Sequence, residues 1–119
     1  MNDFYKLQKI TKQHLASFEA QITLNPRADV YRGHFPNQPI APGVCLVQMV
    51  TEIVSAHLDK KLALKTARQI KFLAVVNPNE VPELTLEVTL SESEIGQNFK
   101  CTAHFENQKF FKISGELSE

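Results

Sequence analysis

Only one segment of this 119-residue chain has the length and hydrophobicity expected of a buried helix. Residues 43–58 carry apolar side chains around most of the helical circumference, and their polar side chains form one narrow stripe. The apolar set is Val44, Leu46, Val47, Val50, Ile53, Val54 and Leu58, and the stripe is Gln48, Thr51, Glu52, Ser55 and Asp59. Because such a helix must be covered on most sides, the rest of the chain has to wrap around it.

The other regular segments have the patterns of strands. Residues 18–24, 84–90 and 99–105 alternate between apolar and polar side chains, and residues 69–76 are mostly apolar. A polar turn at 106–108 leads to a last strand that runs to Leu117. Short turns between consecutive strands favour an antiparallel sheet. The pattern therefore predicts an α+β domain in which an antiparallel sheet curls around one helix.

Length and charge narrow the class of protein. A chain of 119 residues fits a single domain, residues 1–119, with a substantial core. Lys plus Arg equals Asp plus Glu, at 13 each, which argues against a nucleic-acid partner. There is no apolar run near the roughly 20 residues that span a membrane, and no signal-peptide pattern at the start. We therefore expect a cytoplasmic protein that binds neither nucleic acid nor membrane.

The two cysteines predict no metal site. Cys45 and Cys101 fit no zinc or redox spacing, so we expect both to be reduced and buried. Cys45 lies near the start of the helix, where a thiol pKa can fall and a nucleophile can arise. A small packed residue is the interpretation that we favour for it.

The segment that leads into the helix carries the candidate chemistry. Residues 33–44 read GHFPNQPIAPGV, and each proline fixes one φ angle and removes one donor, so a stiff loop is expected. His34 should therefore lie close to a helix N-terminus, where free backbone N–H groups bind developing negative charge. A base beside such a site suits chemistry on a carbonyl compound.

This long motif closely resembles the active-site signature of the FabZ- and FabA-like 3-hydroxyacyl-acyl-carrier-protein dehydratases, which have the hot-dog fold. The resemblance covers about residues 18–117 and includes the sequence IKFLA at 70–74. It implies conversion of a 3-hydroxyacyl thioester, carried by acyl-carrier protein or coenzyme A, to a trans-2-enoyl thioester without metal or organic cofactor. It also implies a homodimer with the acyl chain at the subunit interface, or a hexamer of three such dimers.

The resemblance assigns roles by position. His34 becomes the base that removes the proton next to the carbonyl, and the backbone N–H of Gly43 polarises that carbonyl. We expect the neighbouring Phe35, Pro42 and Val44 to contact the substrate.

The expected acid is missing from its usual place. The family has Glu or Asp five residues after the motif glycine, on the helix of the other subunit, whereas this chain has Gln48. A primary amide can hold water or bind a hydroxyl group but cannot act as a general acid. Many members carry Gln one turn after the acid, where this chain has Glu52, so the two residue types are swapped. We hypothesise that Glu52 supplies the acid, directly or through a water held by Gln48; otherwise both residues only form the polar stripe.

Two other functions remain open at this stage. The chain could be a thioesterase of the same fold, in which a water held by Gln48 attacks the carbonyl. It could instead be a non-catalytic acyl-binding subunit of a dehydratase heterodimer.

A cluster of basic residues follows the helix and has two interpretations. It is either a solvated face or a contact for an acidic acyl-carrier protein. Its members are Lys60, Lys61, Lys65, Arg68 and Lys71.

Overall fold

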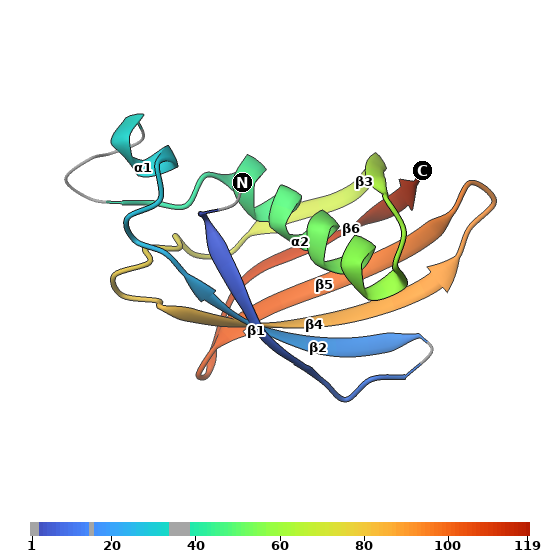
Figure 1. The fold of residues 1–119 in the computed structure, drawn as a ribbon, viewed down its shortest axis with the longest axis horizontal. Coiled ribbons are helices and arrows are strands. Elements are labelled where there is room, and N and C mark those ends of the chain that lie inside the picture. Colours follow the sequence, from blue (N-terminus) through green and yellow to red (C-terminus); the bar gives the residue numbers. More distant parts are fainter. Residues whose placement is uncertain (1–2, 15, 34–38) are drawn as a thin grey trace.

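One curved sheet and one long helix account for most of the residues that the structure describes. The computed structural model describes residues 3–14, 16–33 and 39–119. The elements are β1 (Tyr5–Thr11), β2 (Ser17–Leu24), α1 (Val30–Gly33), α2 (Gly43–Leu58), β3 (Ala63–Phe72), β4 (Glu83–Glu92), β5 (Gln97–Phe105) and β6 (Gln108–Ser118). The six strands pair in the order β1-β2-β4-β5-β6-β3, and every pairing is antiparallel. Helix α2 lies along the concave face of this sheet (Figure 1). The predicted α+β arrangement is confirmed.

Helix α2 has the predicted bounds, and local chemistry explains both ends. Pro42 precedes it in an extended conformation (φ −64°, ψ 140°) and loses nothing by having no N–H. At the other end Asp59 adopts the left-handed conformation (φ 53°) and donates its backbone N–H to Ala56 O. The N–H of Lys60 then reaches back to Ser55 O at 3.0 Å, which closes the helix.

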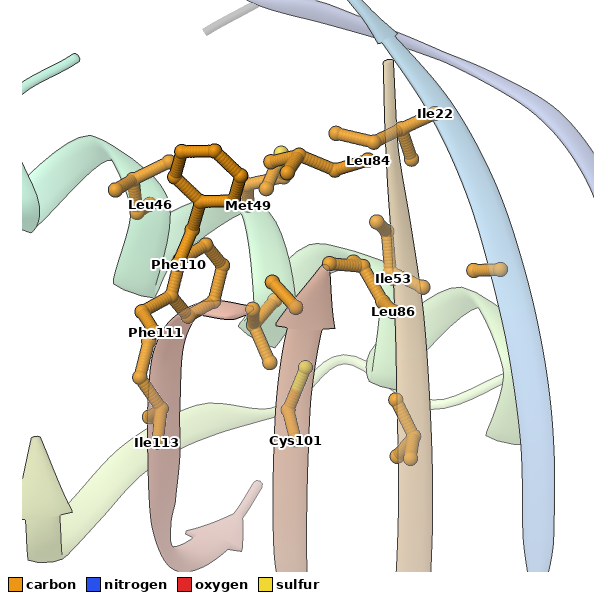
Figure 2. Packing of buried hydrophobic residues seen from close by; sticks show 14 of the residues in the cluster. Ile22, Leu46, Met49, Ile53, Leu84, Leu86, Cys101, Phe110, Phe111 and Ile113 are labelled. Carbon is orange, nitrogen blue, oxygen red and sulfur yellow. The ribbon is translucent and has the colours of Figure 1, made fainter. Parts of the chain in front are cut away.

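The core lies between α2 and the sheet. Leu46, Met49 and Ile53 project from the helix toward the strands (Figure 2). The strands contribute buried side chains to the same core, which include Ile22, Leu84, Leu86, Cys101, Phe111 and Ile113. Thr51, which the sequence placed in the polar stripe, is buried too, because its hydroxyl donates to Val47 O at 3.0 Å and needs no water.

Two strands differ from the sequence-based expectation. Strand β1, which was not predicted, pairs with β2 at one edge of the sheet. Strand β3 forms the other edge and covers 63–72 instead of 69–76. Its first half is exposed and alternates weakly, so it gave no strand signal. Its ladder with β6 ends where the N–H groups of Leu73 and Ala74 both turn to Phe110 O.

The irregular segment after β3 supports the loop before α2. Val76 is buried, and its carbonyl accepts the N–H of Ala41 at 2.8 Å. This bond ties the segment to the chain that enters the helix.

The helices of the described residues include none with the length and hydrophobicity that crossing a membrane requires.

Burial against the sheet predicts which side chains of α2 stabilise the fold. Ile53 is 2% exposed beneath the sheet, whereas Ile95, in the loop between β4 and β5, is 53% exposed. We expect Ile53→Ala to lower the free energy of unfolding by about 2–5 kcal/mol and Ile95→Ala by about 0.5 kcal/mol or less. Urea unfolding followed by circular dichroism measures both. Equal losses for the two variants would contradict this packing.

Candidate active site at the central helix

An apolar cleft opens at the N-terminus of α2. It is lined by Ile40, Ala41, Pro42, Gly43, Leu46, Phe72, Leu73, Ala74, Val75 and Val76. Two of the predicted substrate contacts, Pro42 and Gly43, therefore belong to its wall. As the first residue of α2, Gly43 has a backbone N–H that the helix leaves unpaired. A donor at an apolar wall is suited to bind the carbonyl of a hydrophobic acyl group.

The Phe72 ring packs against the backbone at position 43 and leaves no room for a side chain there unless the ring moves. A Cβ atom added to Gly43 would lie 2.6 Å from Cζ of the Phe72 ring, closer than carbon atoms approach one another. The ring also packs edge-on against Phe111 with 6.4 Å between centroids, yet it remains 48% exposed. The aromatic ring thus lies directly over the backbone that would polarise the carbonyl.

The polar stripe of α2 forms a second hollow, which holds Glu52. Its lining is Gln48, Thr51, Glu52, Ser55, Ala56, Asp59, Lys60, Lys61 and Leu62. Within it, Gln48 Nε2 donates to Glu52 Oε2 at 3.2 Å. The structure therefore brings together the two residues whose order is swapped.

Tyr5 is the residue of this site that the sequence did not reveal. Its hydroxyl donates to Glu52 Oε1 at 2.9 Å, so β1 and α2 are joined across 47 positions of sequence. Burial raises the pKa of Tyr5 well above its usual value near 10, and the hydrogen bond to Glu52 and the charge of Glu52 raise it further. The phenol is therefore protonated, and a donor, throughout the physiological pH range. Tyr5 belongs to no motif, so only the tertiary structure could identify it.

Three predicted site residues remain, of which the structure describes one. His34 and Phe35 fall outside the described residues. Val44 is 76% exposed and does not line the cleft.

The cysteines behave as packed residues. Both thiols are free, and Cys101 is buried as predicted, whereas Cys45 is only partly buried. Burial raises the pKa of each thiol, which lowers the thiolate fraction that a nucleophile needs. No group of described His, Cys, Asp and Glu residues is arranged to hold a metal ion.

A long helix packed in the concave face of an antiparallel sheet, with an apolar cleft at the helix N-terminus, defines a hot-dog protein. The same fold occurs in the solved dehydratase heterocomplex ApeI:P of Xenorhabdus doucetiae, with a TM-score of 0.69, 22% identity, and coverage of 96% of this chain and 97% of that one. An uncharacterised protein from Erwinia carotovora subsp. atroseptica is similar as well, with a TM-score of 0.59, 20% identity, and coverage of 95% and 90%.

Sequence comparison specifies the family. The ApeI-like family model, described as ApeI dehydratase, matches residues 9–114, and the chain therefore belongs to the ApeI-like dehydratase family. The 3-hydroxyacyl-[acyl-carrier-protein] dehydratase FabZ of Levilactobacillus brevis is 32% identical over 89 residues, which are 69% of this chain and 58% of that protein. FabZ of Lactobacillus helveticus is 30% identical over 94 residues, or 73% of this chain and 62% of that protein. The chain thus spans about three-fifths of the length of these relatives.

Proposed function

We propose that the protein is a dehydratase that removes water from a 3-hydroxyacyl thioester, with Glu52 as the acid that the usual position lacks. The observation that carries this proposal is the 3.2 Å contact between Gln48 and Glu52. It puts a carboxylate within one hydrogen bond of the side chain that stands where the family's acid stands. Membership of a dehydratase family and the motif at 33–44 support the same reaction.

The reaction follows from three groups. The N–H of Gly43 binds the thioester carbonyl oxygen, which acidifies the adjacent C2–H bond. The imidazole of His34 takes the C2 proton, and the electron pair left behind forms the C2–C3 double bond. As the C3–O bond breaks, the hydroxyl group leaves with the proton of the Glu52 carboxyl of the second copy, because nine residues, about 14 Å of helix, separate Glu52 from Gly43 within one chain. One water departs and the thioester stays intact. Gln48 can hold the hydroxyl between C3 and Glu52.

Strand β3 is the edge at which we propose that a second copy binds. In the antiparallel ladder Ile70 is opposite Ile113 and Phe72 is opposite Phe111, so both β3 side chains share the face that α2 covers further inward. They are nevertheless 42% and 48% exposed. A ten-residue edge strand with apolar side chains on its inner face is a template for pairing with another chain.

A subunit role within a heterodimer is the second candidate. Two observations favour it: Gln48 stands at the acid position, and the fold is shared with the dehydratase heterocomplex ApeI:P. In that case the partner at β3 is a related dehydratase, and this chain binds the acyl group without turning it over alone.

The basic cluster supplies two candidates for contact with a carrier. Lys60 and Lys61 are exposed at the rim of the hollow that holds Glu52. Arg68, by contrast, forms an ion pair with Glu116 at 3.0 Å and donates to Asn98, so much of its charge is already compensated. An acidic carrier protein, or the phosphate of its prosthetic arm, would meet the two lysines first.

The reaction is tested by hydration of a trans-2-enoyl thioester on acyl-carrier protein, with free thiol followed in the same tube. We expect hydrated product without thiol release, and losses of about 10²–10⁴-fold for His34→Ala and for Glu52→Gln. Gln8→Ala, which removes an exposed bond between β1 and β2, should keep wild-type activity. Thiol release would indicate the thioesterase, and no turnover unless a related dehydratase is added would indicate the heterodimer subunit.

The β3 interface is tested by sedimentation equilibrium. We expect the wild type to form dimers, and Ile70→Glu to raise the dissociation constant at least tenfold, because it places a charge in an apolar contact. Ile95→Glu adds the same charge at a similarly exposed site outside the proposed interface and should leave the dimer intact. A wild type that stays monomeric would rule out the homodimer.

Charge reversal tests the carrier contact. Lys60→Glu with Lys61→Glu should raise KM for the carrier-bound thioester about tenfold at low salt, and leave KM for a small uncharged thioester unchanged. The double variant Lys100→Glu with Lys109→Glu is the matched control, since these exposed lysines lie on β5 and β6 away from the hollow. Unchanged KM for the carrier-bound thioester would refute the contact.

A further inference from the structure

The carboxylate of Glu52 is held by two neutral donors. Tyr5 Oη bonds Oε1 at 2.9 Å, and Gln48 Nε2 bonds Oε2 at 3.2 Å. None of the ion pairs formed within the described part of the chain includes Glu52. Its position in the hollow is therefore determined by hydrogen-bond direction and not by attraction to a cation.

The two hydrogen bonds differ in length and in what holds the donor. The Tyr5 bond is the shorter, and its half-buried donor comes from a rigid ring on a paired strand. The Gln48 bond is at the long end of the normal range, and its donor is an exposed side chain with several rotatable bonds. Oε1 is consequently the fixed oxygen, and Oε2 is the one that can exchange Gln48 for a water or a substrate hydroxyl.

Without Tyr5, Glu52 would have other partners within reach. Lys60 and Lys61 line the same hollow, as does Asp59, which would repel the carboxylate. A glutamate has three rotatable bonds, so a carboxylate released from β1 is free to turn toward either ammonium group. An acid that turned in this way would be removed from the reacting hydroxyl.

We propose that Tyr5 is a positioning residue for the dehydration reaction: its hydroxyl fixes Oε1 of Glu52 so that Oε2 faces the substrate hydroxyl. This inference rests on the proposed function, in which Glu52 is the acid. It assigns strand β1, which lies outside the signature motif, a role in the chemistry of the helix. A carboxylate at position 52 lies one helical turn after the family's acid position, so it needs a hydrogen-bond donor of its own to hold it. The Tyr5 hydroxyl supplies that donor.

The test is steady-state hydration kinetics of Tyr5→Phe. A hydrogen bond to a charged group contributes a free energy that corresponds to about a tenfold to hundredfold change in rate. We therefore expect kcat to fall by that factor while KM stays within about twofold, because the substrate still binds but the acid is no longer held in place.

Two controls separate positioning from a structural effect. Gln8→Ala removes another hydrogen bond of β1 and should change neither kcat nor KM. In a Glu52→Gln background, Tyr5→Phe should cost no further activity, because it acts through the carboxylate. Glu52→Asp, which keeps the charge but withdraws it from Tyr5, should repeat the loss of kcat and serves in place of Tyr5→Phe should that variant fail to fold.

The outcomes discriminate between the two proposals. An active wild type with an unchanged kcat in Tyr5→Phe overturns the positioning role alone, and so does an equal loss in the Glu52→Gln background. A wild type without any hydration, alone or with a related dehydratase, overturns the dehydratase proposal and the role of Tyr5 with it.

Discussion

The packing of α2 against the concave sheet is the contact on which the rest of the structure depends. It buries one face of the helix completely, as shown by Met49 and Val50, which have no exposed surface. Once that face is fixed, so is the rotation of the helix about its axis. Gly43 is then held at the apolar cleft, and Glu52 is held in the polar hollow. The proposed carbonyl-binding N–H and the proposed acid are thus both positioned by a purely hydrophobic contact.

A helix held so firmly limits how the chain can relocate a carboxylate. Moving the acid from position 48 to position 52 displaces it by one turn, about 6 Å along the axis, on the same face. The packed helix cannot slide by one turn to bring Glu52 to the place of residue 48. The side chains around Glu52 must therefore orient its carboxylate instead. Gln48 reaches forward to one carboxylate oxygen, and Tyr5 reaches across from β1 to the other. We interpret the site as a rearrangement of side chains on an unchanged framework.

The sequence predicted the features that follow local rules. The bounds of α2 could be read from Pro42 and from the apolar periodicity, and the strands with clear alternation were placed correctly. The two edge strands were not predicted correctly, because buried and exposed side chains do not alternate along them. Strand β1 was missed, and β3 was misplaced by several residues. The pairing of Gln48 with Glu52 was foreseeable from helical spacing. The contact with Tyr5 was not, because it joins residues 47 positions apart through a strand that gave no signal.

The most direct test of the proposal that Glu52 is the acid is to return the carboxylate to position 48. Hydration by Glu52→Gln would be compared with hydration by the same variant carrying Gln48→Glu as well, which restores the carboxylate to the position used by the FabZ- and FabA-like enzymes. The account predicts that Glu52→Gln loses about 10²–10⁴-fold in rate and that the second substitution recovers a measurable part of the loss. A Glu52→Gln variant that hydrates the thioester as fast as the wild type would contradict it.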